Sequence, residues 1–287
     1  MAQRPPYLTK VKTEELINRG WMSMTLVEKY GPWALVVGGS EGVGAAFAAQ
    51  LAQAGFHLVL SGHESPSLVQ TASAIVEDTG AKVRTVTHDL CIDDPLQPIR
   101  RATDDLEIGL LIYTVGSVVP APSFVDAPLE LGLRAMRLNA LGQTSFAHHF
   151  GGRMKSRGRG GIIMIGSNGG ICGIGGLACY AAAKAYTQIF AEGLWAELKP
   201  FGVDVLCAVL GPTRTPFLGR LGVPIDDPAF AGAWPADTAA VALESLGNGP
   251  VVYPGGSDDV VQATAGLSRA DAVQWATERV RAMSVGT

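Results

Sequence analysis

Short apolar runs that alternate with longer amphipathic windows are the feature that most restricts how this chain can fold. Seven such runs follow one another along the chain, near residues 33–38, 56–61, 82–88, 108–114, 161–166, 203–209 and 250–253. Runs such as Leu-Ile-Tyr-Thr are continuously apolar, which is typical of strands covered on both faces. The pattern therefore predicts repeated βαβ units and a parallel sheet.

The windows between these runs predict the helices. We expect helices near residues 42–54, 66–79, 95–104, 128–155, 178–198, 236–246 and 269–283. Ser268 and Asp271 have the spacing of a capping box before the last helix. With 287 residues, of which 47% are hydrophobic, the chain can bury one large core. We expect a single α/β domain over residues 31–287, preceded over residues 1–30 by an amphipathic N-terminal helical extension.

Net charge and cysteine content limit which binding partners and which cellular compartment we expect for this protein. A formal net charge of −4 offers no electrostatic basis for binding a polyphosphate backbone, so we expect no nucleic-acid partner. The four cysteines have neither C-x-x-C spacing nor the density of a disulfide framework, and no signal-peptide pattern is apparent at the N-terminus. We expect a cytoplasmic protein without a metal site.

The uncharged segment 160–183 is long enough to span a bilayer. Its eight glycines, with Ser167 and Asn168 in the middle, argue against a spanning helix. We expect a buried strand, a tight loop and the first turn of a helix, and no stable membrane insertion. A membrane-associated protein that uses this segment or the N-terminal helix is the alternative.

A glycine-rich turn joins the first predicted strand to an alanine-rich helix. It contains Gly38, Ser40, Glu41, Gly42, Val43 and Gly44. Glycines here permit a tight turn and let backbone N–H groups approach a pyrophosphate at the helix N-terminus. By itself such a turn is as often purely structural. Its place between strand and helix favours a Rossmann-like, doubly wound fold that binds a dinucleotide.

The ends of the next two strands bear on which dinucleotide binds. An acid after the second strand would bond the ribose of NAD, and a base would bind the 2′-phosphate of NADP. Ser61-Gly62-His63 contains neither, yet Gly62 leaves room and His63 can carry charge, so NADP(H) is favoured over NAD(H). A solvated loop histidine is the alternative. Asp89, followed by Leu90, is placed either to reach an adenine or to cap the next turn.

Tyr180 and Lys184 stand one helical turn apart and project from the same face of a helix. Tuning a tyrosine of pKa about 10 for proton transfer at neutral pH takes about 4 kcal/mol. An ammonium about 4 Å away supplies a comparable energy at an effective dielectric constant of about 20. The pair also arises by chance, but Ser167 ends the preceding strand, where a hydroxyl can bond a carbonyl or alkoxide oxygen. Asn139 can position Lys184 through a water.

These motifs together resemble the short-chain dehydrogenase/reductase family over residues 31–217. Gly38 to Gly44 is similar to its cofactor loop, with Val37 where a threonine is usual, and Asp89-Leu90 to its adenine-contacting pair. Asn139 to Gly142 resembles the motif of the catalytic asparagine, and Ser167, Tyr180 and Lys184 match the serine and the Tyr-x-x-x-Lys motif. Two segments depart from the pattern: Tyr113-Thr114-Val115-Gly116 replaces Asn-Asn-Ala-Gly, and Leu210-Gly211 replaces Pro-Gly.

The resemblance implies reversible hydride transfer between the nicotinamide and a carbonyl or secondary alcohol. Tyr180 would give the carbonyl oxygen its proton, Ser167 would hold that oxygen, and Lys184 would lower the tyrosine pKa and bind the ribose. Asn139 would complete a proton relay. Further cofactor contacts are expected from Gly116, Gly211, Thr213 and Thr215. The family also implies a homodimer or homotetramer packed through the helices near 128–155 and 178–198.

Residues 216–234 follow the last of these motifs, and the resemblance implies that they fold over the substrate. Their apolar content, with Cys172, Ile174 and Leu177 in the loop before Tyr180, predicts a hydrophobic carbonyl or alcohol substrate. An ordinary packed segment is the alternative. A non-catalytic dinucleotide-sensing regulator of the same fold is a further alternative, but it would have no need of Ser167, Tyr180 and Lys184 together.

Overall fold

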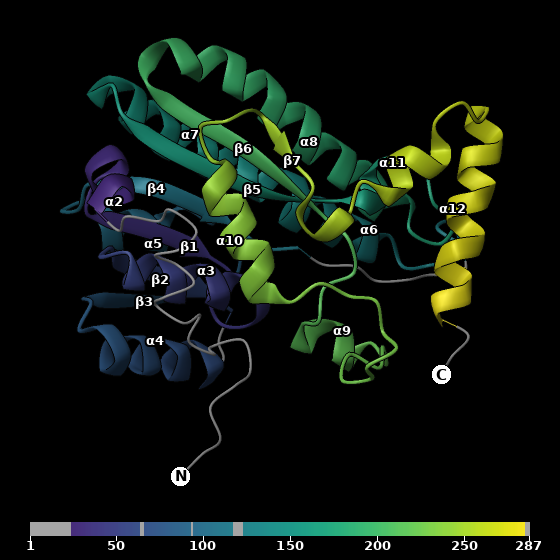
Figure 1. Ribbon diagram of the computed structural model, residues 1–287, viewed down its shortest axis with the longest axis horizontal. Coiled ribbons are helices and arrows are strands. Elements are labelled where there is room, and N and C mark those ends of the chain that lie inside the picture. The colour runs from purple at the N-terminus through teal and green to yellow at the C-terminus, as the bar shows by residue number, and fades with distance from the viewer. Residues whose placement is uncertain (1–23, 64–65, 93, 117–122, 285–287) are drawn as a thin grey trace.

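The chain forms one seven-stranded parallel sheet, seen near the middle of the computed structural model (Figure 1). The structure describes residues 24–63, 66–92, 94–116 and 123–284. The spatial order of the strands is β3-β2-β1-β4-β5-β6-β7. Their bounds are β1 (Trp33–Val37), β2 (His57–Gly62), β3 (Val83–Thr87), β4 (Ile108–Tyr113), β5 (Gly160–Ser167), β6 (Val203–Leu210) and β7 (Val251–Val252). The predicted doubly wound fold and its strands are confirmed.

Helices cover both faces of the sheet, so the five inner strands β2, β1, β4, β5 and β6 are almost wholly buried. One core lies under α3 (Gly42–Gln53), α4 (Pro66–Thr79) and α10 (Pro235–Ser245). The other lies under α5 (Gln97–Thr103), α7 (Gly142–Arg157) and α8 (Ala178–Leu198). Figure 1 shows α7 and α8 on the opposite side of the sheet from α3 and α10. Within the residues described, no helix is both long and apolar enough to cross a membrane.

Most predicted helices are confirmed within a few residues. Segment 160–183 is indeed a strand, a loop and the start of α8. The capping box of α12 (Arg269–Ser284) is present, with Asp271 N donating to Ser268 Oγ at 3.2 Å. Of the predicted N-terminal helix, α2 (Met24–Tyr30) is present, and residues 1–23 lie outside the described part of the chain. Two short helices were not predicted, α9 (Pro216–Arg220) and α11 (Asp259–Thr264).

The single helix predicted over 128–155 is wrong in one respect. It is divided into α6 (Leu129–Met136), a π-helical turn (Arg137–Leu141) and α7. The buried Tyr113 hydroxyl at the end of β4 donates to the Leu138 carbonyl at 2.8 Å. A side chain from the neighbouring strand thus bonds a carbonyl within the widened turn. The local sequence carries no sign of this partner.

Gly142 permits the close approach of Tyr113 to this turn. A Cβ at Gly142 would lie 2.2 Å from the Tyr113 hydroxyl oxygen. We expect Gly142→Ala to lower the free energy of unfolding by about 1–3 kcal/mol, because the tyrosine must move and its buried bond is broken. Urea titration followed by circular dichroism measures the change.

Gly152→Ala is the matched control. Gly152 is exposed on the same helix, and a Cβ there would meet nothing within 4 Å. This variant should be more stable by about 1 kcal/mol, because alanine favours a helix interior. Equal effects of the two substitutions would contradict the role assigned to the Tyr113 contact.

Candidate active site

The turn between β1 and α3 has the geometry of an anion cradle. A Cβ at Gly44 would lie 2.0 Å from the carbonyl oxygen of Gly38, so the helix starts directly against the turn. The first N–H groups of α3 face outward at the carboxyl edge of the sheet, where a helix N-terminus attracts an anion. The turn lies where the strand order reverses between β1 and β4. These residues therefore fit the pyrophosphate of a dinucleotide.

A cavity of about 920 Å³ extends from this turn across the carboxyl ends of the strands. The predicted site residues that line it are Gly38, Ser40, Glu41, Gly42, Val43, Gly44, His63, Asp89, Leu90, Gly116, Ser167, Tyr180, Lys184, Gly211, Thr213 and Thr215. The remaining one, Asn139, is buried behind the wall. Residues distant in sequence thus meet in one hollow large enough for a cofactor and a substrate.

Asp89 caps the turn after β3, which is one of its two predicted roles. Its carboxylate accepts a hydrogen bond from the backbone N–H of Cys91 at 2.9 Å, so it caps the turn after β3. That bond holds the pKa of Asp89 below its usual range, with a smaller contribution from the positive charge of Arg134. Because Asp89 also lines the cavity, capping and a role in cofactor binding are compatible.

Thr114 braces the sheet at a position where the family that the motifs resemble usually has an asparagine. The Thr114 hydroxyl lies 2.8 Å from the carbonyl oxygen of Val37 and 3.2 Å from that of Gly38. The Thr114 N–H also donates to Val37 O at 2.9 Å. β4 is thus tied to the start of the glycine turn by a different side chain, and the departure from the motif leaves this part of the cavity braced.

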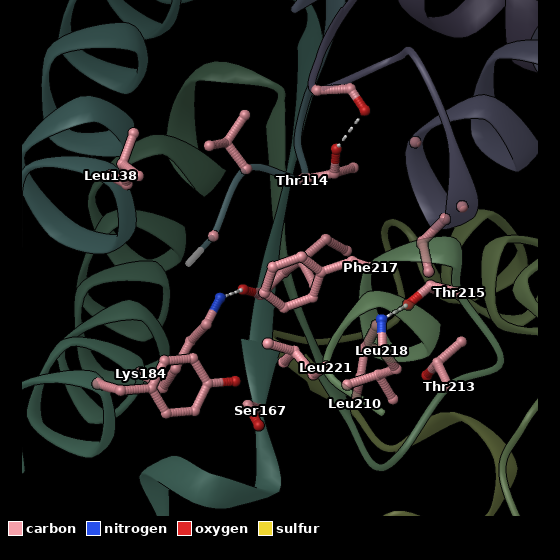
Figure 2. A pocket seen from close by; sticks show the side chains of 18 of the residues that line it. Thr114, Leu138, Ser167, Lys184, Leu210, Thr213, Thr215, Phe217, Leu218 and Leu221 are labelled. Carbon is pink, nitrogen blue, oxygen red and sulfur yellow. Dashed lines mark hydrogen bonds between the residues drawn. The ribbon is translucent and has the colours of Figure 1, made fainter. Parts of the chain in front are cut away.

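Lys184 is a buried cation beside Tyr180. Its ammonium donates to the Ile165 carbonyl of β5 at 2.8 Å and lies 5.9 Å from the centre of the Tyr180 ring. Figure 2 shows Lys184 reaching from its helix toward the strand that ends at Ser167. Burial lowers the pKa of Lys184 to about 8, which leaves it mostly protonated at neutral pH. Burial also raises the pKa of Tyr180, and its hydrogen bond with Ser167 opposes that rise.

Asn139 lies in the π-helical turn, behind Lys184. A Cβ at Gly116 would lie 2.7 Å from Asn139 Oδ1 and 3.2 Å from Lys184 Nζ, so both polar atoms flank the backbone of Gly116. The Asn139 carbonyl accepts a hydrogen bond from Gln143 at 2.6 Å, and its side-chain amide donates to Ala135 O at 2.9 Å. Asn139 is therefore held within reach of the lysine, at the point where the helix widens.

Comparison with known proteins identifies the family. Residues 32–223 match the family described as short chain dehydrogenase. The chain is 34% identical over 225 residues, 78% of its length and 85% of the relative's, to a 7β-hydroxysteroid dehydrogenase of Clostridium sardiniense.

The chain belongs to the short-chain dehydrogenase family. The resemblance to this family is confirmed, and this protein is an NAD(P)-dependent oxidoreductase. The structure from a study of 7β-hydroxysteroid dehydrogenase stereoselectivity superposes with a TM-score of 0.81 at 27% identity, covering 88% of this chain and 98% of the other. A short-chain dehydrogenase of Sphingobium yanoikuyae in complex with NADPH superposes with a TM-score of 0.71 at 27% identity, covering 88% and 95%.

The far side of the cavity in this short-chain dehydrogenase is apolar. Between Phe217 and Phe230, the segment after β6 contributes Phe217, Leu218, Leu221, Val223, Pro224 and Phe230. Figure 2 shows Leu218 and Leu221 across the hollow from Lys184. Val280 of α12 also reaches the cavity, because α12 packs on the loop after Ser167, with Gly175 N donating to Thr277 Oγ1 at 2.9 Å.

Several lining residues were missed by sequence reasoning. They include His88, Thr114, Arg134, Leu138 and Val280. The apolar ones have the same sequence pattern as core residues, so only the fold separates them from the core. Thr114 was noted as a departure from a motif, and its hydroxyl at the end of a buried strand was the available signal.

The buried cation gives a prediction that needs no substrate. The folded pKa of Lys184, about 8, lies below its ordinary value of 10.5. Between these pH values the unfolded chain binds more protons, so burial of Lys184 makes stability rise with pH over this window. Lys184→Met removes that contribution. We therefore expect the stability of the variant relative to wild type to fall by about 3 kcal/mol between neutral pH and a pH of about 10.5.

Urea titrations at several pH values measure this difference. The Ile165 carbonyl loses its donor in the variant at every pH, so the pH-dependent part isolates the charge. Lys82→Met, which removes an exposed lysine, is the matched control. A stability difference for Lys184→Met that is the same at every pH, or is matched by the control, would contradict the argument.

Proposed function

We propose that this protein transfers a hydride between NADP(H) and the carbonyl or secondary hydroxyl group of a bulky apolar molecule, of the size of a steroid. The observation that carries the proposal is the shared cavity. Ser167, Tyr180 and Lys184 lie in the same hollow as the glycine turn, and the opposite wall is apolar. A regulator that only sensed the dinucleotide would have no use for a tyrosine, a serine and a buried lysine together.

The residues of the chain divide the proton chemistry among them. When bound, the nicotinamide supplies the hydride or accepts it. Tyr180 gives its proton to the carbonyl oxygen during reduction and takes it back during oxidation. Ser167 donates a hydrogen bond to that oxygen. The Lys184 ammonium, 5.9 Å from the centre of the Tyr180 ring, is assigned the stabilisation of the phenolate, and a charge at about this distance is worth about 3 kcal/mol at an effective dielectric constant of about 20. Asn139 passes the proton onward through a water.

The cofactor is assigned to the turn and to the strand ends beside it. Gly38 to Gly44 hold the pyrophosphate, Asp89 and Leu90 face the adenine, and Gly116, Gly211, Thr213 and Thr215 border the nicotinamide half. Ser40 and Gly62 lie together where a 2′-phosphate would sit, since a Cβ at Gly62 would be 3.6 Å from the Ser40 hydroxyl. With His63 nearby, this room and this donor favour NADP(H), as does the NADPH complex of a structural relative.

The substrate class follows from the apolar wall. Residues 216–234 are assigned as a substrate lid, because α9 and the loop after it form one side of the cavity. A relative that covers most of the chain is a 7β-hydroxysteroid dehydrogenase. A large apolar wall opposite one hydroxyl, one phenol and one ammonium suits a rigid apolar molecule with a single oxygen at the reacting end.

The chain is also assigned to a homodimer or homotetramer. Leu141, Tyr186 and Ile189 expose 59%, 36% and 66% of their surface on the face shared by the π-helical turn, α7 and α8. The Tyr186 hydroxyl lies 2.7 Å from that of Thr144, which places the two helices side by side. A cluster of exposed apolar side chains on neighbouring helices suits a self-complementary interface between two copies of the chain.

Replacing Tyr180 by phenylalanine tests the catalytic assignment. The wild-type protein should oxidise NADPH in the presence of a steroid ketone, and Tyr180→Phe should reduce kcat by at least about 100-fold, because only the proton donor is lost. NADPH consumption at 340 nm measures turnover across a panel of steroid, long-chain and small ketones.

Nucleotide titrations of the same two proteins are the control. Both should bind NADPH with similar affinity and more tightly than NADH, measured by nicotinamide fluorescence. Tighter binding of NADH would overturn the NADP(H) preference alone. Undiminished turnover by the variant would overturn the role of Tyr180, and no turnover of any ketone or alcohol by the wild type would overturn the proposed reaction.

Light scattering tests the assembly. The wild-type protein should have the mass of a dimer or tetramer, and Ile189→Lys should lower that mass because it places a charge in an apolar interface. Val69→Lys is the matched control, since Val69 is 61% exposed on α4, away from the proposed face. A monomeric wild type would refute the assignment.

A further inference from the structure

The loop after α9 converges on a single side chain, that of Arg214. Its Nε donates to the Gly232 carbonyl at 3.2 Å and its Nη1 to the Asp227 carbonyl at 3.1 Å. The same guanidinium donates to the carbonyls of Ile225 and Phe230. All four acceptors belong to the backbone of residues 225–232. Arg214 therefore fixes the path of this loop, which is a different task from pairing with a surface carboxylate.

Arg214 also fixes an aromatic ring that faces the cavity. Its guanidinium carbon lies 5.3 Å from the centre of the Phe230 ring and 5.0 Å from that of Trp234. Phe230 lines the cavity, and a Cβ at Gly232 would lie 2.2 Å from its ring. The ring is thus held between the guanidinium and the Gly232 backbone, and stacking on a cation adds to its hold.

The two ends of the loop are joined beside the same residue. Arg214 N donates to Ala233 O at 2.9 Å, and Ala233 N donates to Pro212 O at 3.0 Å. The intervening chain contains only one short helix, α9. Between that helix and Trp234, the hydrogen bonds of the guanidinium add to short-range turn bonds, such as Phe230 N to Asp227 O at 3.0 Å.

We propose that Arg214 is a positioning residue for substrate selection, which holds Phe230 and the 225–232 loop as a preformed wall against the bulky end of the substrate. The inference rests on the proposed function and names a residue that sets its specificity. A preformed wall removes the entropy cost of ordering the loop when substrate binds. That benefit applies to a substrate long enough to reach Phe230, and much less to a small ketone bound near Ser167 and Tyr180.

The chemistry requires an arginine. A guanidinium presents five N–H donors in a rigid planar fork and stacks on aromatic rings, whereas an ammonium has three donors on a flexible stem. Arg214→Lys keeps the charge but cannot reach carbonyls at four points around a plane. We therefore expect Arg214→Lys not to hold Phe230 and the 225–232 loop in place. This variant separates the effect of the guanidinium geometry from that of the positive charge.

The test compares selectivity among wild type, Arg214→Lys, Arg214→Met and Phe230→Leu. With saturating NADPH, kcat and KM are measured for a steroid ketone and for cyclohexanone. We expect the ratio of kcat/KM for the steroid ketone to that for cyclohexanone to fall by about tenfold in all three variants, mainly through KM for the steroid. Arg84→Met is the matched control, because the Arg84 guanidinium is likewise hydrogen-bonded and stacked on a ring, but its partners are the Asp105 carboxylate and Trp33 and it lies on β3.

Hydrogen exchange of the 225–232 amides gives a second readout that needs no turnover. Exchange should be faster in Arg214→Lys than in wild type and unchanged in Arg84→Met. An unchanged ratio in variants of an active enzyme, or unchanged exchange, would overturn the inference and leave the proposed function intact. A wild type inactive on both ketones would instead overturn the proposed function and, with it, the selective role, whatever the exchange shows.

Discussion

The hydrogen bond from Lys184 to the Ile165 carbonyl is the interaction on which the site depends. A cation withdrawn from water needs a strong acceptor, and here the acceptor belongs to β5, at the point where Ser167 ends the strand. The bond therefore fixes the position of α8 along the axis of β5. Tyr180, one turn earlier on α8, is brought beside Ser167 as a consequence. A serine, a tyrosine and a lysine from two elements are aligned by one contact.

The remaining parts of the site are placed by the parallel sheet. All strands end at the same edge, so the turn after β1, Asp89 after β3 and Thr114 after β4 meet there regardless of their separation in sequence. Thr114 shows how far the geometry tolerates other residues. Its hydroxyl and N–H tie β4 to Val37, where the rest of the family usually has asparagine. What the bracing requires is a hydrogen-bond donor at this position, and either a threonine hydroxyl or an asparagine amide can supply that donor.

The parts of this architecture that were predictable from sequence are those with a local signal. Strands buried on both faces are continuous apolar runs, and the glycine turn and the Tyr-x-x-x-Lys motif have fixed spacing. The π-helical turn at Asn139 has no such signal, because a hydroxyl on β4 bonds its Leu138 carbonyl. The sequence around Arg214 likewise gives no sign that its role differs from that of an ordinary surface arginine. Its importance depends on the path of a loop that starts eleven residues later and that its own hydrogen bonds define.

An ion pair links the glycine turn to α9. Glu41 lies in the turn assigned to a pyrophosphate, where an uncompensated carboxylate would repel the ligand. Arg220 of α9 pairs with it through both terminal guanidinium nitrogens, and Nη1 lies 2.9 Å from Glu41 Oε2. Gly42 packs beside Thr215, since a Cβ there would lie 3.1 Å from the threonine methyl group. The residue that pairs with Glu41 therefore belongs to the segment proposed as a lid, so the position of α9 and the charge that the turn presents to a dinucleotide are not independent.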